Sequence, residues 1–140
     1  MTVTGLSPRP ELKKNGLCIL VIEDEPSVMA FLRSALERNG YKTVCTTSAL
    51  EGLKLLRSED FQGIISDMRT PGGVSGADVH KWLQSNRPDL AGRILFITGD
   101  TVNQETISIL RKTGAPYMEK PFRVSQLLAM LTQLLGNVSL

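Results

Sequence analysis

The stretch LCILVIED, residues 17–24, is an unbroken apolar run that ends in two acidic residues. A run this rich in Leu, Ile and Val is typical of a β-strand that is covered on both faces, as in a parallel sheet. Pro26 suits the first turn of a helix, and apolar residues then recur at helical spacing until Gly40, which favours a helix end. The segment therefore predicts one buried strand followed by one helix.

The same unit of a strand and a helix recurs along the chain. Four further segments predict strands, and each is followed by residues with helical spacing: YKTVCTT (41–47), FQGIISD (61–67), RILFIT (93–98) and PYMEK (116–120). Alternating elements with short connections predict a parallel sheet with helices on both faces and right-handed crossovers. Five units favour an α/β fold of the flavodoxin-like (βα)5 type, a three-layer sandwich with strand order 2-1-3-4-5.

Composition indicates one soluble domain. The 140 residues are 41% hydrophobic and 21% charged, and no apolar run is long enough to cross a bilayer. The formal charge of +2 comes from scattered residues, so we expect no direct nucleic-acid binding and no membrane contact. We predict a cytoplasmic domain over residues 17–136, with an N-terminal tail or linker (1–16) and a C-terminal tail (137–140).

Cysteine and histidine often serve in catalysis or metal binding, but here they carry no functional signal. Cys18 and Cys45 lack the spacing of a metal site and are predicted to be small buried hydrophobes. The one histidine, His80, has no Ser or Cys paired with it and is predicted to be an exposed helix residue. The candidate site must therefore come from other side chains.

Acidic side chains follow the first and third predicted strands. Glu23 and Asp24 end the first strand, and Asp67 ends the third. In the order 2-1-3-4-5 these strands are neighbours, and the winding direction reverses between them, which is where open α/β sheets bind ligands. Three carboxylates brought together favour a shared cation. Oxygen ligands that are few in number predict Mg²⁺ with bound water.

Two more polar side chains are predicted at the same edge of the sheet. Thr98 ends the fourth strand, and Lys120 lies at the end of the fifth. Together with Mg²⁺ they supply the positive charge and the donors that a transferring phosphoryl group needs. Asp67 is the predicted nucleophile because it leads into a glycine-containing loop. The neighbouring acids Glu23 and Asp24 are better placed to hold metal.

Four motifs in this order resemble the receiver domains of two-component systems, most of all those of hybrid sensor histidine kinases: VIEDEP (21–26), ISDMRTPG (65–72), FITGD (96–100) and EKPF (119–122). The resemblance covers residues 17–135. It implies that Asp67 accepts a phosphoryl group from the phosphohistidine of a histidine kinase or a histidine phosphotransfer protein. It also implies that Mg²⁺ is bound by Glu23, Asp24, Asp67 and the backbone carbonyl of Arg69.

The resemblance implies a switch as well. Thr98 and Tyr117 would move when Asp67 is phosphorylated, Lys120 would bind a phosphoryl oxygen, and the bond to Pro121 would be cis. The face formed by the fourth helix, fifth strand and fifth helix would then report the change and could form a homodimer. Such a domain is not a kinase and catalyses only its own phosphorylation and dephosphorylation. It occurs alone or within a hybrid histidine kinase, including membrane-associated ones.

Two other classes stay open. A Mg²⁺-dependent phosphatase of the haloacid-dehalogenase type also combines Asp, Thr and Lys on a parallel sheet. That family has a DxD motif at the first strand, which EDEP (23–26) lacks. A pseudo-receiver that binds partners without phosphate would lack one of the site groups, and all five are present. A flavodoxin is disfavoured because no phosphate-binding loop follows the first strand.

Overall fold

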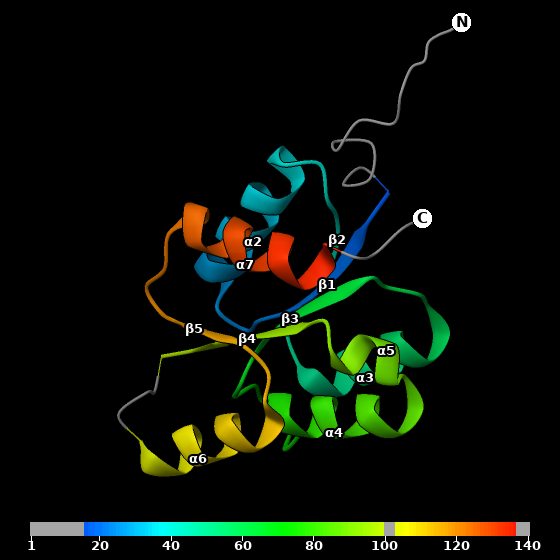
Figure 1. The fold of residues 1–140 in the computed structure, drawn as a ribbon, viewed down its shortest axis with the longest axis vertical. Coiled ribbons are helices and arrows are strands. Elements are labelled where there is room, and N and C mark those ends of the chain that lie inside the picture. Colours follow the sequence, from blue (N-terminus) through cyan, green and yellow to red (C-terminus); the bar gives the residue numbers. More distant parts are fainter. Residues whose placement is uncertain (1–15, 100–102, 137–140) are drawn as a thin grey trace, which may run out of the picture.

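The computed structural model describes residues 16–99 and 103–136. Five parallel strands form one sheet in the order β2-β1-β3-β4-β5 (Figure 1). The strands are β1 (Cys18–Ile22), β2 (Lys42–Thr46), β3 (Gly63–Asp67), β4 (Ile94–Thr98) and β5 (Tyr117–Glu119). The predicted flavodoxin-like fold is confirmed. The predicted tails lie outside the described residues, apart from Gly16.

Helices cover both faces of the sheet (Figure 1). They are α2 (Pro26–Arg38), α3 (Ala49–Ser58), α4 (Gly76–Asn86), α5 (Pro88–Ala91), α6 (Gln104–Thr113) and α7 (Val124–Leu135). The helices α2 and α7 pack on one face, and α3, α4 and α6 pack on the other. The sequence did not predict α5, a single turn that begins at Pro88 because proline suits the first position of a helix.

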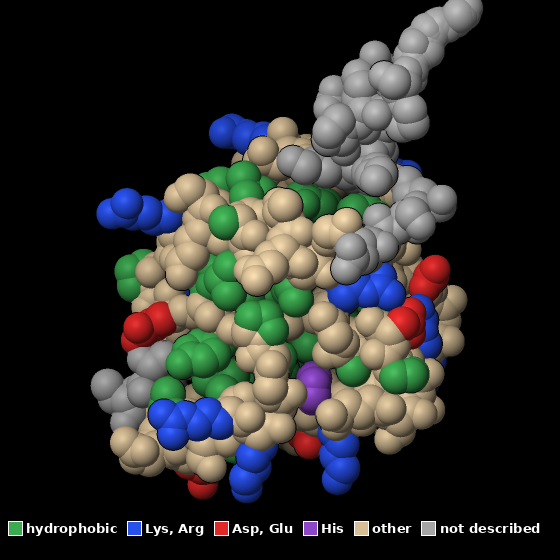
Figure 2. Space-filling model, viewed as in Figure 1, with side chains coloured by type: hydrophobic (Ala, Val, Ile, Leu, Met, Phe, Trp, Pro, Cys, Tyr) green, Lys and Arg blue, Asp and Glu red, His purple; other side chains and the backbone are tan. Residues whose placement is uncertain are grey.

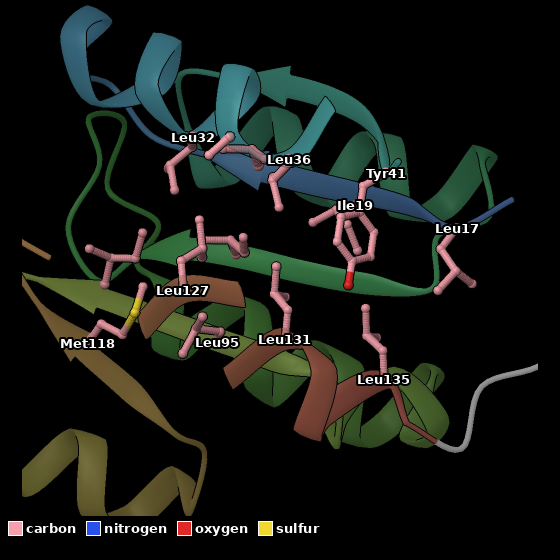
Figure 3. Close-up of a cluster of buried hydrophobic side chains, with 14 residues drawn as sticks. Leu17, Ile19, Leu32, Leu36, Tyr41, Leu95, Met118, Leu127, Leu131 and Leu135 are labelled. Carbon is pink, nitrogen blue, oxygen red and sulfur yellow. The ribbon is translucent and has the colours of Figure 1, made fainter. Parts of the chain in front are cut away.

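Two hydrophobic clusters sandwich the sheet. Every residue of β3 and of β4 is buried, which explains why these strands lack an alternating polar face. Figure 3 shows the cluster beneath α2 and α7, in which strand side chains meet helix side chains such as Leu36, Leu127 and Leu131. The sheet is therefore a rigid support for the residues that follow its strands.

Side-chain caps fix where three helices begin. Ser75 and Asp78 form a reciprocal capping box at the start of α4. Ser48 caps α3 by accepting from the backbone N–H of Glu51, and Asn103 caps α6. Each cap lies in the connection that follows a strand. It therefore fixes where that connection ends and the next helix begins.

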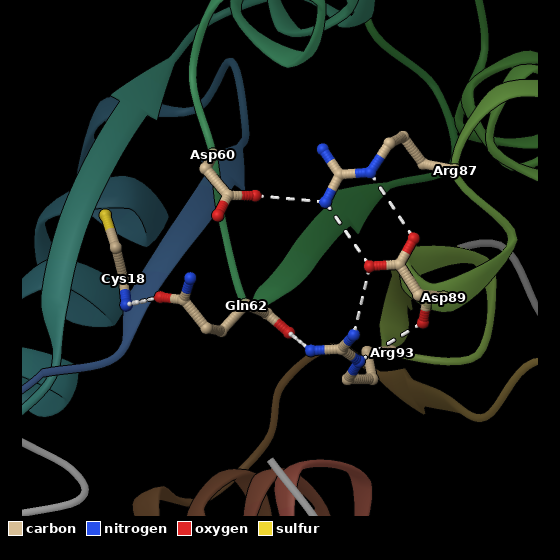
Figure 4. A network of polar contacts seen from close by, with 6 residues as sticks. All are labelled: Cys18, Asp60, Gln62, Arg87, Asp89 and Arg93. Carbon is tan, nitrogen blue, oxygen red and sulfur yellow. Dashed lines mark hydrogen bonds and ion pairs between the residues drawn. The ribbon is translucent and has the colours of Figure 1, made fainter. Parts of the chain in front are cut away.

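A polar network lies at the end of the sheet where the strands begin (Figure 4). Arg93 donates to the backbone carbonyl of Gln62 at 3.1 Å, and the Gln62 side chain accepts from the Cys18 backbone N–H at 2.7 Å. Asp89 pairs with both Arg87 and Arg93, at 3.3 and 3.2 Å. These contacts join the starts of β1 and β3 to α5, so their role is structural.

His80 corrects one sequence prediction. It is buried, with 5% of its surface exposed, because α4 turns it toward the Phe96 ring, whose centroid is 6.2 Å away. Burial lowers the pKa of His80, partly offset by a hydrogen bond to the backbone of Ala91. Helical spacing alone did not reveal this, because His80 lies on the edge of the apolar stripe formed by Val79 and Leu83.

The surface offers few other signals. Cys18 and Cys45 are half-buried free thiols whose pKa values burial raises. Figure 2 shows hydrophobic side chains in the middle of the viewed face and charged side chains mainly toward its rim. Among the described residues, no helix combines the length and apolar character that a bilayer span requires.

Candidate functional site

The site lies where the parallel strands end. Glu23 directly follows β1, Asp67 is the last residue of β3, and Thr98 is the last residue of β4. In the register of the sheet Ile22 lies beside Ser66, so Glu23 and Asp67 are neighbours. The connections on the two sides of this β1–β3 boundary run in opposite directions, so the strand ends open into the crevice expected from topology.

The ammonium of Lys120 lies among three carboxylates. Its Nζ atom is 2.8 Å from Glu25 Oε1, 2.9 Å from Asp67 Oδ2 and 3.0 Å from Glu23 Oε1. The backbone places it there, because the Lys120 N–H donates to the Thr98 carbonyl at 2.8 Å and extends the β4–β5 pairing. One cation therefore links the ends of β1, β3 and β5.

Burial sets the electrostatics of this group. Glu23 is fully buried, and burial raises its pKa, although a hydrogen bond from the Glu25 backbone N–H and the nearby Lys120 ammonium oppose the shift. Burial alone would lower the pKa of Lys120. The contacts with Glu25, Asp67 and Glu23 outweigh burial and raise that pKa, so Lys120 is held in its charged form.

The acidic side chains that converge in the structure include one that the sequence analysis did not single out. Glu23, Glu25 and Asp67 each offer an oxygen within 4.8 Å of the others, whereas Asp24 is exposed and outside this set. The chain is extended at Glu25, with φ −81° and ψ 117°, and alternate residues of an extended chain point to the same side. Sequence reasoning missed Glu25, although alternation along EDE could have found it. The metal role of Asp24 stays a prediction.

The residues present fit a hard divalent cation. All of the converging ligand atoms are carboxylate oxygens, the type that Mg²⁺ prefers. Glu23 Oε1 is buried and lies 3.0 Å from the Lys120 ammonium. The geometry of that contact is not that of a hydrogen bond, and this oxygen accepts none from the described part of the chain. A buried carboxylate oxygen that lacks such a bond costs free energy and favours an additional cation.

The remaining predicted residues surround this cluster. Thr98 is buried, and its neighbour Gly99 leaves the aliphatic stem of Lys120 uncovered by a side chain. The backbone N–H of Arg69 donates to Asp67 Oδ1 at 3.2 Å, and the Arg69 guanidinium lies 3.4 Å from Thr106 Oγ1. Their functional roles, and the role of the Arg69 carbonyl, stay predictions.

Two predicted residues lie at the β5 side of the site. Tyr117 is 42% exposed at the start of β5, so its ring points away from the core. The peptide bond between Lys120 and Pro121 is cis. Phe122, the next residue, packs edge-on against Phe31 with ring centroids 5.7 Å apart.

The loop after Asp67 is anchored at both ends. Gly76 N–H donates to the Met68 carbonyl at 3.0 Å, and the Thr70 hydroxyl accepts from the Ala49 N–H at 2.9 Å. Between these anchors Gly72 and Gly73 adopt φ values of 100° and 79°, which residues other than glycine rarely adopt. The glycine pair therefore lets the chain turn sharply within this loop.

A hollow of about 500 Å³ adjoins the carboxylate cluster. It is lined by Glu25, Ser27, Val28, Phe31, Lys120, Pro121 and Phe122. Phe31 is 41% exposed on α2, so the hollow combines an aromatic wall with the charged pair of Glu25 and Lys120. It gives solvent a direct route to the cluster.

Comparison with known proteins identifies the class. Residues 19–132 match the family model of the response regulator receiver domain. The chain belongs to this family, whose members are the phosphoacceptors of two-component signalling. The prediction from the sequence motifs is confirmed at the level of the family.

The chain is similar to individual curated proteins. It is 31% identical over 121 residues to the response regulator SaeR of Staphylococcus epidermidis, and 29% identical over 120 residues to SaeR of Staphylococcus aureus. Both matches cover 86% of this chain and 51% of the relative. The chain therefore spans about half the length of the curated relatives that it matches.

Solved structures agree on the fold. The receiver domain of a signal transduction histidine kinase from Syntrophus aciditrophicus is 26% identical, with a TM-score of 0.79 over 88% of this chain and 92% of that one. The receiver domain of a Pseudomonas aeruginosa sensor histidine kinase has a TM-score of 0.77 at 20% identity, over 87% of this chain and 99% of that one. That structure holds a magnesium ion in its active site cleft.

Proposed function

We propose that Asp67 is the phosphoacceptor of this receiver domain. The observation that carries the proposal is the contact of 2.9 Å between Asp67 Oδ2 and the Lys120 ammonium at the strand ends. An ammonium in this place can bind a phosphoryl oxygen once Asp67 carries the group. Asp67 also keeps 8% of its surface exposed, whereas the neighbouring Glu23 is fully buried. A phosphodonor can therefore reach Asp67 but not Glu23.

The chemistry requires one bond to form and one to break. A carboxylate oxygen of Asp67 attacks phosphorus while the P–N bond of the donor phosphohistidine breaks, and the electron pair passes to the imidazole, which takes up a proton. Lys120 and the Thr98 hydroxyl stabilise the phosphoryl oxygens. The domain thus catalyses its own phosphorylation and is not itself a kinase.

Mg²⁺ is the proposed cofactor. Glu23, Asp67, the Arg69 carbonyl and Asp24 are its proposed ligands, and the convergence of the Glu23 and Asp67 carboxylates supports a cation at this place. When bound, the ion neutralises charge on the transferring phosphoryl group. The magnesium-bound relative from Pseudomonas aeruginosa supports the same cofactor here by analogy of fold.

The proposed partners are a histidine kinase or a histidine phosphotransfer protein, and the proposed location is the cytoplasm. Thr98 and Tyr117 would carry the signal to the face formed by α6, β5 and α7, which could also serve for dimerisation. A hollow of about 330 Å³ between the end of α6 and α7 supports a binding role for that face. Membership in a hybrid kinase is a further proposal that rests on the sequence resemblance.

Intact-mass measurement tests the function. The protein is incubated with phosphoramidate and Mg²⁺, and we expect a mass gain of one phosphoryl group that Asp67→Asn abolishes. Omission of Mg²⁺ should slow the reaction strongly. A gain that survives Asp67→Asn would show that another residue is modified and would contradict the proposal. An unmodified wild type would favour a pseudo-receiver.

A further inference from the structure

We propose that Glu25 is a positioning residue that restrains Lys120, so that a phosphoryl oxygen can bind Lys120 only after the ion pair with Glu25 opens. The inference rests on the proposed function of Asp67 and Lys120. Neither the motifs nor the family comparison gives Glu25 a role. Of the three carboxylates around Lys120, Glu25 makes the shortest contact, at 2.8 Å.

The ammonium of Lys120 is already surrounded by acceptors: it donates to Glu25 and Asp67, and it forms an ion pair with Glu23. A lysine ammonium has three N–H donors and no acceptor. Lys120 Nζ has three carboxylate oxygens between 2.8 and 3.0 Å, one each from Glu25, Asp67 and Glu23. A phosphoryl oxygen that binds Lys120 therefore has to replace one of these contacts.

Exposure indicates which contact opens. The side chain of Glu25 is 57% exposed, against 11% for Asp67 and none for Glu23. Ion pairs that water can reach are worth less than buried ones, so the pair with Glu25 is the weakest of the three. The hollow of about 500 Å³ beside Glu25 gives its side chain room to swing away.

Apart from its place among the three clustered carboxylates, the Glu25 side chain makes no further contact that the described structure shows. It is the residue before α2, but its side chain accepts no capping hydrogen bond from that helix. Its backbone N–H donates to Glu23 Oε2 at 3.0 Å, a contact that does not depend on the side chain. Glu25 can therefore be replaced without loss of a helix cap.

Two variants separate contact from charge. Glu25→Ala removes both the contact with Lys120 and the negative charge. Glu25→Asp keeps the charge, but its side chain is one methylene shorter and aspartate favours capping the helix. If the contact restrains Lys120, both variants should free it. If Glu25 only repels the anionic donor, Glu25→Asp should behave like the wild type.

The experiment measures the rate of phosphorylation by phosphoramidate at fixed Mg²⁺, with Asp67→Asn as the baseline. We expect both Glu25 variants to react about two- to fivefold faster, the range that follows from losing one partly exposed ion pair. The ¹⁵N resonance of the Lys120 ammonium should shift in both variants. Mg²⁺ affinity, measured by calorimetry, should change little.

Several results would overturn the inference. Acceleration in Glu25→Ala alone would assign the effect to charge, and unchanged rates would show that no restraint exists. Slower reaction together with weaker Mg²⁺ binding would make Glu25 a metal ligand instead. If wild-type Asp67 takes no phosphoryl group, the proposed function fails and the inference fails with it. Normal phosphorylation with unaffected variants would overturn the inference alone.

Discussion

Replacing Lys120 with methionine should destabilise the protein when no metal is bound and should strengthen its response to Mg²⁺. Methionine is similar in length but carries no charge. In the wild type Lys120 contacts Glu23, Glu25 and Asp67 between 2.8 and 3.0 Å. Lys120→Met therefore leaves three clustered carboxylates without their cation.

The cost follows from the burial of each carboxylate. Breaking a buried ion pair costs about 3–5 kcal/mol, whereas an exposed pair contributes about 1 kcal/mol or less. Glu23 is fully buried and the Asp67 side chain is 11% exposed, but Glu25 is 57% exposed. Protonation of Glu23, whose pKa is already raised, relieves part of the strain. We expect a loss of about 2–3 kcal/mol at pH 7.

Urea unfolding at zero and saturating Mg²⁺ measures both effects. A ligand that binds only the folded state stabilises it in proportion to the logarithm of its concentration over its dissociation constant. Lys120 competes with the metal for the same oxygens, so Lys120→Met should bind Mg²⁺ more tightly. Each tenfold gain in affinity adds about 1.4 kcal/mol to the free energy of unfolding at high Mg²⁺.

Lys81→Met is the matched control, because Lys81 is exposed on α4 and far along the chain from the site. It should change the free energy of unfolding by about 0.5 kcal/mol or less and leave the response to Mg²⁺ unchanged. Equal effects of the two lysine variants, or equal stabilisation of wild type and Lys120→Met by Mg²⁺, would refute the reasoning.

Three further predictions concern the scaffold. Gly76→Ala should cost about 1–3 kcal/mol in thermal or urea unfolding, because its new Cβ would lie 2.8 Å from the backbone carbonyl oxygen of Asp67. Gly92→Ala should be nearly neutral, because its new Cβ would lie 4.0 Å from its nearest neighbour, the Asp89 carbonyl oxygen. Ser75→Ala should cost about 1 kcal/mol because it removes the capping box of α4, and no loss would mean that the cap is unimportant. Burial lowers the pKa of His80. The wild type should therefore lose stability as pH falls below about 6.5, by at most about 1.4 kcal/mol per pH unit. His80→Gln, measured by the same unfolding series, should remove that part of the slope, and an unchanged slope would contradict the assignment.

Much of the fold could be predicted because its signals are local. The apolar runs before Asp67 and Thr98 predicted buried strands, and the structure buries every residue of both strands. Strand order followed from the alternation of strands and helices, since crossovers have one hand. The burial of His80 could not be predicted in this way. It depends on how far α4 is rotated about its axis against Phe96.

The sequence by itself determined the class of protein and the residues at the strand ends, because hydrophobic periodicity and the order of the motifs are properties of the chain alone. Only the tertiary structure decided which acids face Lys120. Glu23 and Glu25 share one side of an extended segment, and Asp24 is left exposed. That choice depends on the direction in which each side chain leaves the backbone and on distances between residues that are far apart along the chain, such as Glu23 and Lys120. Composition and spacing do not contain this information.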